Sequence, residues 1–332
     1  MDRSRRIFIL SIPLLLLCAI LSIIIGPSGV LSIDMLRAML AGETALPAWR
    51  ILMYVRIPRT LAAIIAGSAL AGSGLILQSV LRNPLASPGV IGVNSGAGLG
   101  AMLFTALLPG MWGAAPVAAF LGACLSVMAV YLLARLTDAS RMTLVLSGVA
   151  VNSLLGACMD AIVTLIPDAA LARSVFAIGG FSGVTMDKLL FALPFWCLGL
   201  LPPVIFRREI EIMTLGDEVA HGLGMHVERW RLIFLLCAAL LSGAAVSFAG
   251  LIGFVGLIVP HMARRILKND GRLLMPFTLV SGGILCLVCD VVARTLFAPY
   301  ELPVGVVLSF LGAPFFIFLL INRKRSNRHD SV

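Results

Sequence analysis

Few residues of this sequence could do chemistry, and two carboxylates among them lie inside long apolar stretches. These are Asp160 and Asp290, and an ionised group in hydrocarbon is costly unless it faces a cavity or a partner. Arg294 follows Asp290 by one helical turn, so we expect a structural i,i+4 ion pair there. Asp160 is the candidate for a proton relay if the chain works as a proton-coupled transporter.

The sequence lacks the side-chain sets that are typical of enzyme active sites. It contains neither the H-E-x-x-H motif of zinc proteases nor the G-x-S-x-G motif of serine hydrolases. A lone C-x-x-C, Cys286 and Cys289, has no second pair and no nearby histidine, so buried thiols are expected. No lysine follows a glycine as the phosphate-binding loop requires. We therefore expect a chain that is not an enzyme and holds no cofactor or metal ion.

The elements that must position these residues are membrane-spanning helices. Of the 332 residues, 60% are hydrophobic and 12% charged, which is too little charge to cover a water-soluble domain. Apolar stretches of about 20 residues, the length that crosses a bilayer core, recur along the chain. They predict one all-α transmembrane domain over residues 1–332 with ten spans. The predicted spans are Ile7 to Ile25, Leu61 to Leu81, Pro88 to Leu108, Ala114 to Leu133, Thr143 to Ile166, Leu189 to Phe206, Leu232 to Ala249, Leu251 to Leu267, Leu273 to Leu296 and Pro303 to Ile321.

The distribution of Lys and Arg predicts the orientation of these spans. Basic residues collect on the cytoplasmic side, and ten spans with an inner N-terminus leave only seven of the 25 outside. Those seven are Arg37, Arg50, Arg56, Arg59, Arg173, Lys188 and Arg294. Both termini are therefore expected in the cytoplasm. Topology also accounts for the net charge of +9, so no nucleic-acid-binding surface is expected.

Two segments of the chain resemble each other faintly. Ala66 to Gly89 and Ala238 to Pro260 are both helices rich in small residues that lead into a proline-containing turn, and their predicted directions are opposite. Such a pair is typical of inverted repeats in transporters, where the substrate route lies near the interface of the two halves. Glycines and Pro260 interrupt the span from Leu251 to Leu267, which we expect to be short or partly re-entrant.

The stretch from Glu209 to Glu228 is the one sizeable polar segment expected on the cytoplasmic side. Thr214, with Asp217 three residues later, is close to a capping box, and Gly222 and Gly224 can end a helix, so two short helices are expected. Its apolar positions form a stripe that a solvated loop would expose to water, and they are Met213, Leu215, Val219 and Leu223. The stripe predicts docking to a partner protein, and a solvated loop is the alternative.

Several blocks along the chain together resemble the permeases of ABC importers for ferric siderophores, haem and cobalamin, the FecCD-type subunits of type II importers. The blocks are Arg56-Ile57-Pro58-Arg59, Gln78 with Arg82-Asn83-Pro84-Leu85-Ala86, Gly148, Leu215-Gly216-Asp217-Glu218-Val219-Ala220, Gly253-Phe254-Val255-Gly256-Leu257-Ile258-Val259-Pro260-His261 and Gly312-Ala313-Pro314-Phe315-Phe316. Each block alone is a weak signal. Their number and matching intervals make the resemblance specific.

The resemblance implies an assembly in the inner or plasma membrane of a bacterium. Two permease subunits, a homodimer or a close heterodimer, would enclose a path along the dimer axis. Two cytoplasmic ATPase subunits would bind ATP and Mg, and an extracytoplasmic binding protein would deliver the cargo. A ferric siderophore is the first cargo implied, with haem and cobalamin as alternatives.

The resemblance also implies roles for particular residues. The segment that enters a groove on the ATPase would contain Leu215, Gly216, Asp217, Glu218, Val219, Ala220, Leu223 and Gly224. Arg56, Arg59 and Arg294 match outward-facing arginines that receive acidic residues of the binding protein. Asn83, Leu85 and Ser140 match a cytoplasmic gate.

Two other classes of function compete with this reading. A proton-coupled secondary transporter would use Asp160 and need no ATPase, but it leaves the apolar stripe and the outer arginines unexplained. An intramembrane enzyme would need a catalytic set converging from several helices, and the sequence offers none.

Overall fold

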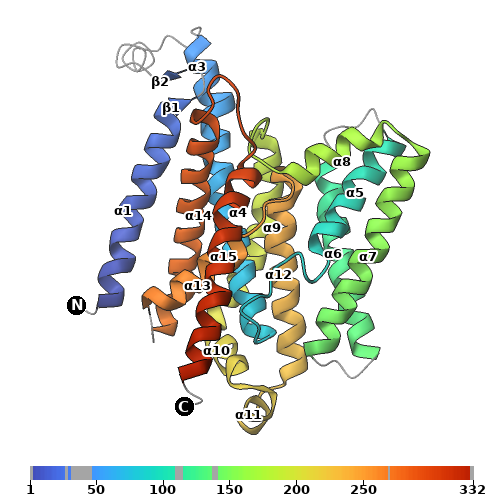
Figure 1. The fold of residues 1–332 in the computed structure, drawn as a ribbon, viewed down its shortest axis with the longest axis vertical. Helices are drawn as coiled ribbons and strands as arrows, with labels where there is room; N and C mark the ends of the chain where they lie inside the picture. The colour runs from blue at the N-terminus through green and yellow to red at the C-terminus, as the bar shows by residue number, and fades with distance from the viewer. Residues whose placement is uncertain are drawn as a thin grey trace.

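The computed structural model describes residues 3–26, 29–30, 47–108, 115–136, 141–267 and 270–329, which are almost entirely helical (Figure 1). Turns and loops join the helices, and β1 (Ile25–Gly26) forms a short antiparallel pairing with β2 (Gly29–Val30). The helices of the first half are α1 (Arg3–Ile24), α3 (Pro47–Ile51), the π-helical η1 (Leu52–Arg56), α4 (Ile57–Val80), α5 (Val93–Leu107), α6 (Ala115–Leu136), α7 (Arg141–Leu165) and α8 (Ala169–Ile178). Those of the second half are α9 (Met186–Ile205), α10 (Arg207–Leu215), α11 (Asp217–Gly222), α12 (Val227–Ala249), α13 (Val255–Leu267), α14 (Gly271–Thr295) and α15 (Val304–His329).

Seven helices among the described residues are long and apolar enough to cross a membrane. They are Arg3–Ile24, Trp49–Val80, Ala115–Leu136, Met142–Leu165, Met186–Ile205, Val227–Ala249 and Gly271–Thr295. The spans predicted from Pro88 and from Pro303 correspond to shorter apolar helices, and α8 is a third one that the sequence did not predict. The predicted all-helical membrane fold is confirmed, whereas the count of ten spans stays a prediction.

The centre of the molecule is α4, which packs against α12 and α14. Small residues allow the helices to come into backbone contact, as in other membrane bundles. A Cβ added to Gly67 would collide with the carbonyl oxygen of Gly282 on α14. By contrast, α1 stands at the periphery of the bundle and packs mainly on α14 (Figure 1).

We expect Gly67→Ala to destabilise the protein by about 1–3 kcal/mol, the usual cost of forcing an extra carbon into a packed interior. Gly156→Ala on α7 is the matched control, because a Cβ there meets nothing within 4 Å and alanine favours a helix. Thermal unfolding in detergent measures both variants. Equal unfolding temperatures for the two variants would contradict the close α4–α14 contact.

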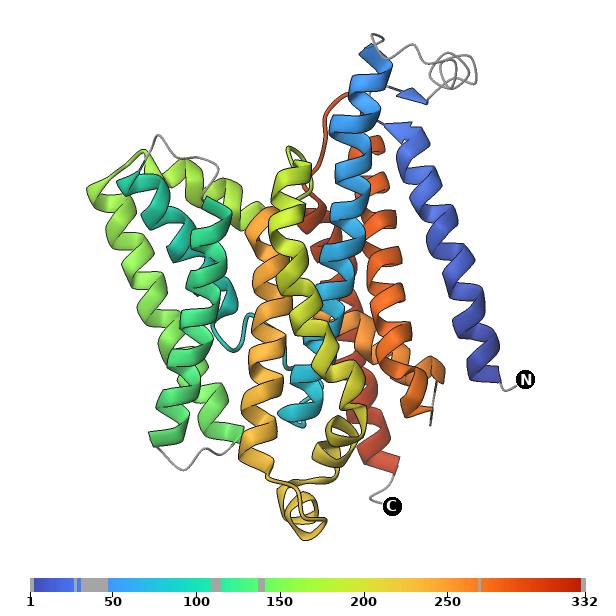
Figure 2. The ribbon, with the colours of Figure 1, turned by 180° about the vertical axis from the view of Figure 1, so that it is seen from behind.

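The predicted pair of similar segments corresponds to two helices that are each followed by an irregular stretch and a shorter helix. In the first half α4 leads through residues 81–92 to α5, and in the second half α12 leads through residues 250–254 to α13. The two long helices run in opposite directions, as predicted (Figure 2). Because α13 has only 13 residues, the prediction of a short helix in this region is confirmed.

The two ends of the molecule differ in what they carry. The beginning of α1, the end of α15 and the pair α10–α11 lie at one end, and β1, β2 and α3 lie at the other (Figure 1). The segment predicted to dock to a partner therefore lies at the same end as the beginning of α1 and the end of α15.

Candidate functional site

A coupling surface, defined here as Leu215, Val219 and Leu223, projects from α10 and α11. These side chains are 56%, 50% and 63% exposed. The opposite sides of the same helices are buried, and Met213 and Ala220 are among the residues there. The two predicted short helices and three of the four predicted stripe positions are confirmed. The exposure predicted for Met213 is wrong, because its side of α10 packs into the core.

The join between α10 and α11 is held in a defined conformation. Gly216 caps α11 with a φ of +121°, which favours glycine, and a Cβ there would lie 2.9 Å from Nη1 of Arg82. Asp217 pairs with the buried Arg231 of α12 at 2.8 Å. The capping predicted for Thr214 is wrong, since its hydroxyl donates to the carbonyl of Glu211 within α10 instead.

The predicted gate lies in the turn that follows α4. Oδ1 of Asn83 accepts a hydrogen bond from the backbone N–H of Leu85 at 2.9 Å, which fixes a tight turn. Leu85 is exposed at its tip. Ser140, the third residue predicted for the gate, lies outside the described residues.

At the other end of α4 the structure forms an ion-pair cluster, which consists of Arg59, Asp290, Arg294 and Glu301. Arg59 donates to both carboxylate oxygens of Asp290 at 2.9–3.1 Å and to Glu301 at 2.8 Å. Arg294 lies 3.4 Å from Asp290, so the predicted i,i+4 pair is confirmed. Asp290 is fully buried, and its charge is stabilised by two guanidinium groups.

Arg56, Arg59 and Arg294 are only 6%, 5% and 1% exposed in this structure, and their predicted contact with a binding protein stays a prediction. Two of them satisfy the last carbonyls of α1, which have no donor within their own helix. Arg56 donates to Ile23 and Ile24 at 2.9 and 2.6 Å, and Arg294 donates to the carbonyl and hydroxyl oxygens of Ser22 at 2.9 and 2.7 Å. In this structure Arg56 and Arg294 therefore hold the end of α1 against the rest of the bundle.

The second intramembrane carboxylate has a different environment. Asp160, near the end of α7, forms an ion pair with Arg173 of α8, and both side chains are exposed. The sequence predicted that Asp160 needs a cavity or a partner, and Arg173 is that partner.

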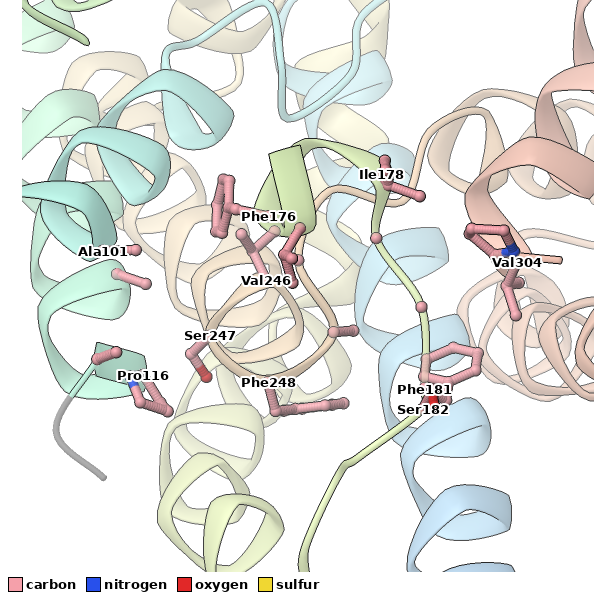
Figure 3. Close-up of a pocket in the computed structure, with 18 of the residues that line it drawn as sticks. Ala101, Pro116, Phe176, Ile178, Phe181, Ser182, Val246, Ser247, Phe248 and Val304 are labelled. Atoms are coloured by element: carbon pink, nitrogen blue, oxygen red, sulfur yellow. The ribbon is translucent and has the colours of Figure 1, made fainter. Parts of the chain in front are cut away.

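A cavity of about 670 Å³ opens at the end of the molecule opposite α10 and α11. Figure 3 shows that residues of α8 and of the last turn of α12 line it, with Phe176, Val246 and Phe248 among them. The charged lining residues are two cations and two anions, namely Arg59, Lys188, Asp168 and Glu301. The sequence analysis did not predict this cavity, because α8 has only ten residues and is too short to be recognised as a membrane span.

The sequence matches the model of the FecCD transport family over residues 14–322. This chain belongs to the FecCD transport family. A hemin transport system permease of Yersinia pestis is 38% identical over 325 residues, which are 95% of this FecCD chain and 96% of the relative. An achromobactin transport system permease of Dickeya dadantii is 38% identical over 322 residues, covering 95% and 91% of the two chains.

A solved structure described as an inward-facing conformation of a metal-chelate type ABC transporter has the same fold. It superimposes with a TM-score of 0.83 at 26% identity, covering 96% of this FecCD chain and 99% of the other. With the apolar helices above, family membership makes the chain a multi-pass membrane protein of a transporter. The family resemblance inferred from the sequence blocks is confirmed.

Proposed function

We propose that this FecCD family chain is the permease subunit of a binding-protein-dependent ABC importer, and that it carries an iron chelate into the cytoplasm of a bacterium. The observation that carries the proposal is the coupling surface on α10 and α11. Three large apolar side chains held on two rigid short helices are costly to leave in water and typical of a protein contact. A separate ATPase subunit, which binds ATP and Mg, is the partner that we assign to this contact.

The proposal includes the remaining parts of the assembly. Ten spans with both termini in the cytoplasm place the coupling surface inside, consistent with its position beside the chain ends (Figure 1). The cavity then opens outward, where a binding protein would release its cargo. Its volume of about 670 Å³ falls in the usual range for ligand sites, roughly 300–1,000 Å³. A second permease subunit, identical to the first, completes the path.

The cargo that we propose to test first is a ferric siderophore. Relatives named for hemin and achromobactin support an iron chelate as the class. Haem and cobalamin are the comparison cargoes, and binding proteins loaded with each would be compared at equal concentration.

Liposomes containing the assembled complex test the proposal directly. We expect import of the chelate only while ATP is hydrolysed, with hydrolysis stimulated by loaded binding protein. Asp160→Asn should import at the wild-type rate, because Asp160 lies in an exposed ion pair and lines neither the cavity nor the coupling surface. Import that continues without the ATPase and stops in Asp160→Asn would identify a proton-coupled transporter instead.

A further inference from the structure

Pro260 leaves a gap in the hydrogen bonding of α13 that a side chain of α4 fills. Proline has no N–H, so the carbonyl oxygen of Gly256, four residues earlier, loses the donor that an α-helix normally supplies. Nε2 of Gln78 donates to that oxygen at 3.0 Å, and the Gln78 side chain is buried. An amide 178 positions away in the sequence thus replaces the missing backbone group.

The other atom of the same amide is also bound to α13. Oε1 of Gln78 accepts a hydrogen bond from Nη1 of Arg264, and Nη2 of Arg264 donates to Oγ of Ser79 at 3.3 Å. One helical turn before Gln78, a Cβ added to Gly74 would collide with the backbone of Gly256, so α4 and α13 are in direct contact. Gln78 therefore ties α4 to both turns of α13 that flank Pro260.

The same end of α4 also contacts the coupling helices. α10 packs against α4, and Arg82, two residues beyond α4, lies against the Gly216 cap of α11. The last turns of α4 thus stand between the coupling surface and the short helix α13. A displacement of α10 and α11 has a contiguous path to α13 through these contacts.

We infer that Gln78 is a positioning residue of the transport cycle, which keeps the end of α4 and α13 moving as one body when α10 and α11 are displaced. This inference rests on the proposed function, because the displacement comes from the ATPase. The simpler role for Gln78 is local: it would only satisfy Gly256 and thereby stabilise α13.

Two sets of variants separate these roles. Gln78→Met removes both hydrogen bonds at similar side-chain length, and Pro260→Ala supplies the missing N–H inside α13. In the double variant the helix is repaired but the tie to α4 stays broken. Gln78→Glu has the opposite effect. Its carboxylate still accepts a hydrogen bond from Arg264, which keeps α4 tied to α13, but it offers no donor to the carbonyl oxygen of Gly256. Each is measured in liposomes with the ATPase and loaded binding protein, as chelate imported per ATP hydrolysed, alongside its unfolding temperature.

We expect the double variant to import less chelate per ATP than Pro260→Ala, by about threefold or more, within the range for broken coupling contacts. Gln78→Glu should unfold at a lower temperature than the wild type but import nearly as much chelate per ATP hydrolysed. A double variant with the same ratio of imported chelate to hydrolysed ATP as Pro260→Ala would overturn the inference and leave Gln78 the local role.

A wild-type complex without ATP-dependent import would instead refute the proposed function, so the two failures are distinguishable. Should Gln78→Met alone not fold, the repaired double variant and Gln78→Glu still decide the question.

Discussion

Asp290→Ala is expected to lower the free energy of unfolding by about 3–5 kcal/mol, the cost of leaving buried charges without their partner. Arg59 and Arg294 both point at this carboxylate, and both are buried. Removing Asp290 leaves two guanidinium groups in the interior with Glu301 as the one remaining anion of the cluster. Thermal or denaturant unfolding of the purified protein in detergent measures the loss.

Asp160→Ala is the matched control for this experiment. Both carboxylates lie in apolar helices and both pair with arginine, but the Asp160–Arg173 pair is exposed. Exposed pairs contribute about 0–1 kcal/mol, so this variant should unfold close to the wild type. If Asp290→Ala were as stable as Asp160→Ala, the ion-pair cluster could not be what holds α1, α4 and α14 together.

The second large effect is expected at the coupling surface. Leu223→Asp should abolish stimulation of ATP hydrolysis by the binding protein, with import falling about thirtyfold or more, because a truncated or charged anchor in a protein contact costs at least about 2 kcal/mol. Leu223 is 63% exposed and makes little contribution to the core, so the chain itself should fold normally. Co-purification with the ATPase and import into liposomes are the measurements.

Leu223→Met, which keeps an apolar side chain of similar volume, is the control and should retain most of the import. Reversing Asp217 would be a less clear test, since that carboxylate also anchors α11 to Arg231. Wild-type association and import by Leu223→Asp would show that the ATPase does not bind this surface.

The sequence predicted best where the relevant partners are close along the chain. The i,i+4 spacing of Asp290 and Arg294 sufficed to predict their pair. Two short helices were predicted correctly, although α11 begins after Gly216 and is not capped by Thr214. The predicted exposure of Met213 was wrong, because in such short helices the hydrophobic pattern alone does not say which apolar residues face the core.

Long-range contacts account for the other differences. Arg59 lies 231 residues from Asp290, so no local pattern reveals that the two charges meet. The positive-inside rule concerns the side of the membrane on which an arginine lies, and it says nothing about whether the side chain is buried. Gln78 belongs to a block that resembles the family, yet its role depends on Pro260 and Arg264, which only the folded structure brings to it.

The capping of α1 has a consequence for the biosynthesis of this protein. The helix is translated well before α14, and one of the two side chains that satisfy its last carbonyls, Arg294, follows Ser22 by 272 residues. Until then the end of α1 can be satisfied only by Arg56, water or lipid headgroups. We therefore expect α1 to reach its final position against α14 only after α14 has been translated.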